Sequence, residues 1–237
     1  LGSSEMWTFQ KEFFSKDYRV ITPALPGFGE SHIVKSLDSI NKMAKEIINV
    51  LDQKKIDKFN LMGHSMGGVV AARLAYDFED KIQKSILIDP VLQPQSLKFQ
   101  IPFFNISNKS FISLLNFFKK NRASEMINNA KKRRSVFSDK EEIFKHYQGR
   151  GAFTNWPEES LKAYINGGVI EEENKINLSC APEWEAKTFA VSYAARTNFI
   201  KKLSKQIYVP FASEASDANG TYTVSYTHLT LPTTYEV

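Results

Sequence analysis

One serine of this chain stands in a pattern that can do chemistry. Ser65 lies in Gly63-His64-Ser65-Met66-Gly67, a G-x-S-x-G motif between a short apolar run, 59–62, and a run of small residues, 69–75. A serine on a sharp strand-to-helix turn exposes its hydroxyl as a nucleophile. The Met66 N–H, at the start of the helix, would face the oxyanion that the attack creates. The spacing therefore predicts acyl-transfer chemistry at Ser65.

The two glycines of the motif have a steric role in this interpretation. We expect Gly63 and Gly67 to lie where the turn closes against the strand and the helix, with no room for a side chain. A chance match is the alternative, because a G-x-S-x-G string is common by itself. The strand-like run before it, the helix-like run after it and a second glycine motif upstream favour the functional interpretation.

A serine hydroxyl needs a base to take its proton, and the base needs an orienting acid. The chain has four histidines. We expect His32 and His146 at the surface, and we expect the turn to aim His64 away from the serine. His228 lies in an unusual C-terminal stretch. We therefore predict that this chain lacks the base.

Alternating strands and helices surround the motif. Apolar runs predict strands over 19–22, 59–62 and 85–90. Apolar residues at helical spacing predict helices over 5–16, 37–53 and 66–78. Ser36 is the expected N-cap of the second helix. Strands and helices that alternate at short spacing predict an α/β fold with a parallel sheet covered by helices.

Three segments resemble the serine α/β-hydrolase family, esterase- and lipase-like. Besides the motif at Ser65, they are Leu1-Gly2-Ser3-Ser4 and Pro26-Gly27-Phe28-Gly29-Glu30-Ser31. The resemblance covers residues 1–210 and implies an α/β-hydrolase fold, a parallel-sheet core (truncated here) with a helical cap insertion. It also implies that the N–H of Leu1 is the second oxyanion donor. Ala24 replaces the usual aspartate of the second segment, which removes a structural hydrogen bond but no catalytic group.

The resemblance also suggests where the acid of the catalytic triad lies. Family members place it after the strand that begins near Ile207, where Asp217 is the candidate in this chain. Some relatives place it after the strand that here ends in Asp89. A strand-end aspartate that binds nearby backbone is the favoured interpretation of Asp89.

The resemblance divides the chain into four parts. Residues 1–90 are the expected first part of the core, and 91–205 the helical cap over the Ser65 edge of the sheet, in which we expect no strand. Residues 206–223 are the expected remnant of the returning core, although 211–220 are too polar and small for a central strand. Residues 224–237 resemble the translation of a transposon end used in sequencing libraries. We set them aside as an artefactual tail, with a β-strand as the alternative.

The composition limits the kinds of partner and cofactor that we expect for this chain. The net charge is +5 over 237 residues, and the basic run Lys131-Lys132-Arg133-Arg134 is the expected solvated face of a helix, not a nucleic-acid or membrane patch. The single cysteine, Cys180, excludes an internal disulfide and is the expected buried thiol. No run is long and apolar enough to span a membrane. We expect no metal, no cofactor, no nucleic acid and a cytoplasmic location, with a secretory signal before Leu1 as the alternative.

Two classes of function remain. The first is a serine hydrolase that cleaves a carboxylic ester of a small or medium hydrophobic substrate through an acyl-enzyme on Ser65. C–C bond hydrolases and amidases of the family use the same turn, whereas its dehalogenases and epoxide hydrolases use aspartate. The second class is a non-catalytic binding protein of the same fold. A binder has no need of a strained turn, which favours the hydrolase.

Overall fold

The computed structural model describes residues 2–34, 39–91, 123–194, 199, 207–216 and 222–230. The chain divides into two compact units. Unit 1 comprises Leu1–Leu37 and Ser124–Thr188, and unit 2 comprises Asp38–Ala123 and Phe189–Val237. The predicted boundaries of core and cap, at 90 and 205, stay a prediction.

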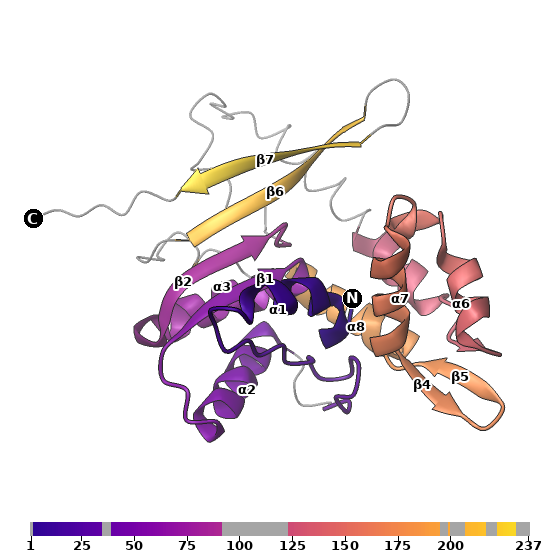
Figure 1. The fold of residues 1–237 in the computed structure, drawn as a ribbon, viewed down its shortest axis with the longest axis horizontal. Coiled ribbons are helices and arrows are strands. Elements are labelled where there is room, and N and C mark those ends of the chain that lie inside the picture. The colour runs from indigo at the N-terminus through magenta and orange to yellow at the C-terminus, as the bar shows by residue number, and fades with distance from the viewer. Residues whose placement is uncertain are drawn as a thin grey trace, which may run out of the picture. The chain divides into compact units, whose positions relative to one another are not determined.

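A four-stranded sheet forms the centre of unit 2 (Figure 1). Its strands, in spatial order, are β1 (Phe59–His64), β2 (Ile82–Ile88), β6 (Ile207–Ser216) and β7 (Tyr222–Thr230). β1 and β2 are parallel, with Gly63 opposite Leu87 and His64 opposite Ile88. β6 is parallel to β2 and antiparallel to β7. The predicted parallel pairing of the runs that flank the serine motif is therefore present.

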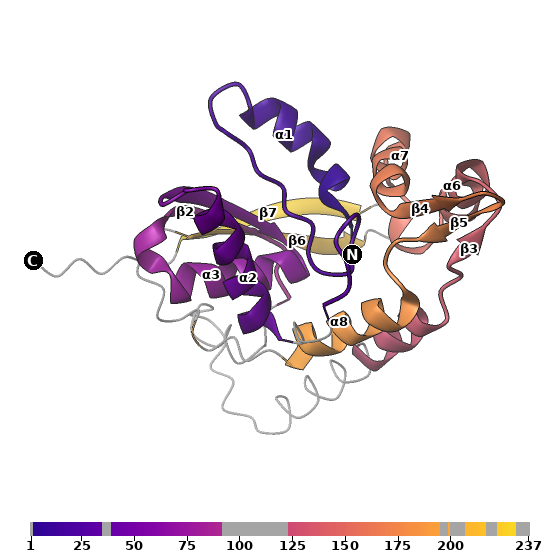
Figure 2. The same ribbon diagram turned by 90° about the horizontal axis from the view of Figure 1, so that it is seen from below.

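Two helices accompany this sheet, α2 (Ile40–Gln53) and α3 (Met66–Asp77) (Figure 2). α3 packs on β1 and β2, and α2 packs on α3. Small residues of α3 allow the close approach, because Ala71 and Ala72 form a buried cluster with Leu87 and Ile207. A short 3-10 helix, η2 (Glu79–Lys81), joins α3 to β2.

The N-terminus of α2 differs from the prediction. Ser39 caps the helix, because its side chain accepts a hydrogen bond from the Lys42 N–H at 3.3 Å. Ser36, the predicted cap, lies outside the described residues. Two serines three positions apart precede this helix, and the sequence pattern does not separate them.

Unit 1 holds short helices and a small antiparallel sheet. Its helices are η1 (Ser4–Trp7), α1 (Thr8–Phe14), residues 123–131, α6 (Lys140–Tyr147), η3 (Gly151–Phe153), α7 (Glu158–Gly167) and the first part of α8 (Pro182–Ala194). Its strands are β3 (Val136–Phe137), β4 (Val169–Glu172) and β5 (Lys175–Leu178), in the order β3-β5-β4 (Figure 2). The expectation of no strand between 91 and 205 is therefore wrong. These strands have two to four residues, too few to show an alternating pattern in the sequence.

Aromatic and aliphatic side chains together form the core of unit 1. The buried cluster consists of Phe137, Ile143, Tyr147, Leu161, Tyr164, Ile165, Ile176 and Leu178. The phenylalanine-rich part of the expected cap, residues 103–118, lies outside the described residues.

Two further segments differ from the sequence-based expectations. Residues 19–22 form no strand, because no described strand hydrogen-bonds to them and a strand needs a partner. Residues 211–216, expected to be too polar for a central strand, continue β6. They pair with β7, and only Ile207 and Tyr208 pair with β2. Residues 222–230 form β7, which agrees with the strand alternative, whereas the artefactual origin of 224–237 stays a prediction.

Candidate active site

Ser65 connects β1 to α3 in a rarely populated backbone conformation. Its φ is 54° and its ψ is −117°. Such a conformation costs on the order of 1–3 kcal/mol for a residue with a side chain, and strain of this kind gathers at functional sites. The serine side chain does not cap α3, although it stands at the N-cap position. The predicted strand-to-helix turn is therefore present, with the Ser65 hydroxyl not used by the helix.

Backbone hydrogen bonds hold the serine to the neighbouring strand. The Ser65 N–H donates to the Ile88 carbonyl at 2.9 Å, and the Ser65 carbonyl accepts from the Val91 N–H at 3.4 Å. The same carbonyl accepts from the Gly68 and Val69 N–H groups of the first turn of α3. Hydrogen bonds to the end of β2 and to the first turn of α3 therefore hold the strained residue in place.

Steric requirements at the turn agree with the prediction at one glycine and differ at another. A Cβ at Gly63 would lie 2.4 Å from the Gly67 carbonyl oxygen and 2.8 Å from the Ala71 Cβ. A Cβ at Gly67 would meet nothing within 4 Å, so the expectation for this residue is wrong. Gly68 is the second crowded position, where a Cβ would lie 2.9 Å from the Pro90 Cβ. The helix turns Gly68 toward the strands and leaves Gly67 on the open side.

Met66 is the first residue of α3, and its N–H is one of the groups that a helix leaves without an intrahelical acceptor. The partial positive charge of the helix N-terminus adds to the attraction for an anion there. The side chain of Met66 is buried. Leu1, the predicted second oxyanion donor, lies outside the described residues.

No histidine hydrogen-bonds to Ser65 in the described part of unit 2. His64 is the last residue of β1, and its side chain remains exposed. Desolvation by the protein around it lowers the pKa of His64, and the Asp89 carboxylate opposes this shift. His146 belongs to unit 1, where its ring packs on the rings of Phe137 and Tyr147. It is therefore half-buried rather than a surface residue.

The last histidine, His228, lies in β7 opposite Pro210. The absence of a base for Ser65 stays a prediction.

The structure describes only one of the two candidate acids. Asp217 lies outside the described residues. Asp89 follows β2, is exposed, and has a positive φ of 40°. It therefore stands at the same sheet edge as Ser65. The expected hydrogen bonds from nearby backbone N–H groups to the Asp89 carboxylate are not found among the described residues.

The second glycine motif forms a tight loop in unit 1. Gly27 and Gly29 have positive φ values of 79° and 55°. Trp184 of α8 closes over the loop, and its indole N–H donates to the Pro26 carbonyl at 2.7 Å. A Cβ at Gly27 would overlap the Trp184 ring, so glycine is required at this position for steric as well as conformational reasons.

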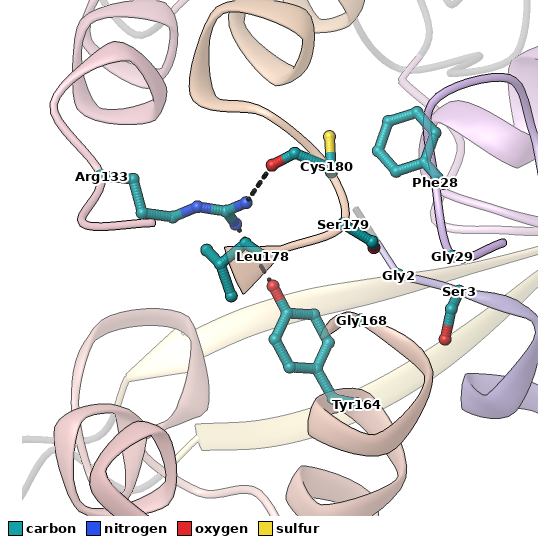
Figure 3. A pocket seen from close by; sticks show the side chains of 10 residues that line it. All are labelled: Gly2, Ser3, Phe28, Gly29, Arg133, Tyr164, Gly168, Leu178, Ser179 and Cys180. Atoms are coloured by element: carbon teal, nitrogen blue, oxygen red, sulfur yellow. Dashed lines mark hydrogen bonds between the residues drawn. The ribbon is translucent and has the colours of Figure 1, made fainter. Parts of the chain in front are cut away.

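Sequence reasoning missed the role of Arg133. Lys131, Lys132 and Arg134 are exposed, as predicted, but the helix ends at Lys131, so the run is not the helix face that we expected. The Arg133 side chain is only 18% exposed. Its guanidinium forms an ion pair with Glu185 at 3.0 Å and donates to the Tyr164 hydroxyl at 3.2 Å (Figure 3). Nothing within the run itself separates this arginine from its neighbours, because its partners lie 31 and 52 residues away.

Cys180 is a free, buried thiol, as predicted. Burial and the nearby Glu185 carboxylate raise the pKa of Cys180 to about 12, which makes the thiol unreactive near neutral pH. The described residues contain no cluster of histidine, cysteine, aspartate and glutamate that could hold a metal ion. Among the helices of the described part, none has both the length and the apolar character needed to cross a membrane.

A strained serine between a parallel strand and a helix, with a crowded glycine before it, has the strand-turn-helix geometry of a nucleophile elbow in an α/β protein. Residues 1–112 match the family model described as alpha/beta hydrolase fold. The crystal structure of E-2-(acetamidomethylene)succinate hydrolase aligns with a TM-score of 0.69 and 14% identity, over 88% of this chain and 68% of that one. The chain therefore has the α/β-hydrolase fold.

Curated relatives match a smaller part of the chain. The dihydrolipoyllysine-residue acetyltransferase component of the acetoin cleaving system of Cupriavidus necator is 32% identical over 38% of this chain and 24% of its own length. The 2-hydroxy-6-oxo-6-phenylhexa-2,4-dienoate hydrolase of Burkholderia cepacia is 35% identical over 33% of this chain and 28% of its own length. The chain thus spans about a third or less of the curated relatives that it matches.

Proposed function

We propose that this chain is a serine hydrolase that cleaves a carboxylic ester of a small or medium hydrophobic substrate through an acyl-enzyme on Ser65. The observation that carries the proposal is the backbone conformation of Ser65, with φ 54° and ψ −117°. The turn costs stability, and its hydroxyl makes no cap hydrogen bond that would explain it. A nucleophile that must stand clear of the sheet accounts for both facts.

The proposed reaction uses Ser65 and Met66 in defined roles. The Ser65 hydroxyl oxygen attacks the ester carbonyl carbon, and a base takes its proton. The Met66 N–H stabilises the oxyanion of the tetrahedral intermediate, and the N–H of Leu1 is the proposed second donor. The alcohol then leaves with a proton, and water hydrolyses the acyl-serine by the same steps. Asp217 is the proposed acid, with Asp89 as the alternative.

Two other functions keep some support. The name of the Burkholderia relative supports C–C bond hydrolysis, because the same elbow serves that reaction. A non-catalytic binding protein is supported by the missing contact between Ser65 and a histidine in the described part of unit 2. The strained serine favours a hydrolase over a binder.

The test is covalent labelling and ester turnover by the full chain. A fluorophosphonate should label the protein at Ser65, slowly because the predicted lack of a base leaves the hydroxyl a weak nucleophile, and the Ser65→Ala variant should not be labelled. Ser15→Ala, which removes an exposed serine at the end of α1, is the matched control and should behave as the wild type.

Turnover of p-nitrophenyl butyrate separates the alternatives. Loss of one triad member lowers turnover by on the order of 10⁴ to 10⁶. We therefore expect very slow hydrolysis that Ser65→Ala abolishes. A rate typical of esterases would contradict the predicted lack of a base but not the hydrolase. The absence of both Ser65 labelling and Ser65-dependent turnover would overturn the proposal in favour of a binding protein.

A further inference from the structure

The segment that follows β2 is irregular where it meets Ser65. In a regular parallel pair, a residue donates its N–H to a carbonyl of the neighbouring strand, and its own carbonyl accepts from the N–H two residues further along that strand. The Ser65 N–H donates to the Ile88 carbonyl at 2.9 Å, so the regular partner of the Ser65 carbonyl would be the N–H of residue 90. Residue 90 is a proline, which has no N–H. The Val91 N–H donates to the Ser65 carbonyl instead, at 3.4 Å.

Two residues, Asp89 and Pro90, therefore stand opposite the single residue Ser65, which is the arrangement of a β-bulge. The pairing before this point is regular, because each residue from Leu61 to His64 faces the next residue of β2 in turn. Bulges occur next to active sites, where they redirect a side chain. Here the irregularity begins at the residue that we propose as the nucleophile.

The backbone is strained on both sides of this bulge. Asp89 has a φ of 40° and Ser65 a φ of 54°. The Asp89 side chain is exposed, so its packing does not explain the positive φ. The extra residue does explain it, because the chain must fold outward at Asp89 for the Val91 N–H to reach the Ser65 carbonyl.

Pro90 anchors the bulge to the start of α3. The proline is buried, and a Cβ at Gly68 would lie 2.9 Å from the Pro90 Cβ. The N–H groups of Gly68 and Val69 donate to the Ser65 carbonyl, which also accepts from the far side of the bulge. All these residues belong to unit 2. A change of the backbone at Asp89 is therefore transmitted to Ser65 through hydrogen bonds and close packing.

We propose that the bulge of Asp89 and Pro90 holds Ser65 in its strained conformation, and that Asp89 is a positioning residue through its backbone rather than its carboxylate. Aspartate and asparagine adopt a positive φ more readily than most residues, and β-branched residues do so least readily. The inference deepens the proposed function. Its consequence for the chemistry rests on the hydrolase proposal, whereas its consequence for the Ser65 backbone does not.

The first experiment measures the Ser65 backbone by NMR of the full chain with isotope-labelled serine. The coupling between the amide and α protons of Ser65 reports its φ, and the signal that is missing from Ser65→Ala identifies the residue. Asp89→Val should change this coupling, because valine resists the positive φ on which the bulge depends. Asp89→Gly and Asp89→Asn should retain the coupling of the parent protein.

The second experiment measures the kinetics of fluorophosphonate labelling at Ser65. In Asp89→Val, the maximal labelling rate should fall at least about tenfold, because a displaced nucleophile reacts slowly, and the half-saturating concentration should change by less than about twofold. Asp89→Asn lacks the carboxylate but tolerates the positive φ, so it should restore the rate to within about threefold of the parent.

Lys55→Val is the matched control. Lys55 also has a positive φ, of 56°, and belongs to unit 2, but it follows α2 rather than β2. Valine there imposes a similar strain and should change neither the labelling rate nor the Ser65 coupling. Urea denaturation verifies that each variant is folded under the labelling conditions. Asp89→Ala, which carries a milder penalty, replaces Asp89→Val if the latter does not fold.

Three results would overturn the inference. They are an unchanged Ser65 coupling in Asp89→Val, an equal loss of labelling in Lys55→Val, and an equal loss in Asp89→Asn, which would make the carboxylate the active group, as in a catalytic acid. No labelling of the parent protein would instead count against the hydrolase proposal. The coupling measurement would then still decide whether the bulge holds Ser65.

Discussion

Strain in the backbone singles out three residues with side chains. Lys55, Ser65 and Asp89 have positive φ values, among the described residues. Lys55 follows the C-cap of α2, where a left-handed residue commonly ends a helix. Ser65 and Asp89 have no such local explanation, and they follow neighbouring parallel strands. The ligand-binding edge of an α/β sheet is the edge at which these strands end.

The strain at Ser65 predicts a specific order of stabilities. Ser65→Gly should unfold at higher urea concentration than Ser65→Ala, because glycine adopts a positive φ without a penalty and alanine does not. The expected difference in the free energy of unfolding is about 1 kcal/mol. Both variants should lose the Ser65 chemistry equally. Equal midpoints in urea would show that the turn relaxes and stores no strain.

Residue roles were predictable from the sequence where a local pattern encodes them. The elbow serine, the positive φ of Gly27 and the burial of Cys180 follow from motif, loop composition and residue type. Arg133 could not be separated from its basic neighbours, because its role depends on Glu185 and Tyr164, which are distant in the chain. The same holds for Gly68, whose crowding depends on Pro90.

Among the elements, α3 is the one whose placement depends most on single residues. Its inner side carries Gly68, Ala71 and Ala72, all buried, and small side chains there let the helix lie on β1 and β2. Gly67 has no such neighbours, so its glycine is not needed for packing. We therefore expect substitution of these two adjacent glycines to have opposite effects on the stability of the protein.

Alanine substitution tests this difference. Gly68→Ala should destabilise unit 2 by about 1–3 kcal/mol, because its Cβ would overlap Pro90 in a closely packed site. Gly67→Ala should be neutral or stabilising by up to about 1 kcal/mol, since alanine favours a helix over glycine. Urea denaturation of both variants measures the difference. A larger loss at position 67 than at 68 would contradict the packing described here.

The elements were predictable in proportion to their length and periodicity. α2 and α3 extend over enough residues to show a helical pattern, and β1 and β2 are short apolar runs before turn signals. β3, β4 and β5 are too short for their pattern to be read, and β6 depends on its pairing with β7. Residues 19–22 show the reverse case, in which an apolar run forms no strand without a partner.

Considered as a whole, the molecule joins distant parts of its sequence within each unit. In unit 1, the Trp184 indole N–H donates to the Pro26 carbonyl, 158 positions away. Residues from 2–29 and from 133–180 line one small cavity of this unit (Figure 3). Buried polar and titratable groups gather there, namely Arg133, Tyr164, Cys180 and Glu185. Burial raises the pKa of two of them, Tyr164 and Cys180, so the stability of the fold depends on pH.

Two of these groups predict a loss of stability in alkaline solution. Burial raises the pKa of Tyr164 from 10.0 to about 12 and that of Cys180 from 9.0 to about 12. Both groups are neutral when protonated, so the folded state keeps protons that the unfolded state releases. The stability is therefore complete below about pH 9 and falls as the pH rises toward 12.

The prediction is a negative slope of the free energy of unfolding against pH, up to about 1.4 kcal/mol per pH unit for each group. Cys180→Ala should make the slope shallower from pH 9 upward, whatever its cost at pH 7, and Tyr164→Phe should do so from pH 10 upward. Tyr18→Phe, at an exposed tyrosine, is the control and should leave the slope unchanged. Urea titrations at intervals from pH 7 to 11 provide the slopes. The same slope in Cys180→Ala as in the wild type would mean that this thiol ionises as readily in the folded protein as in the unfolded chain, and that the packing around it is looser than the structure describes.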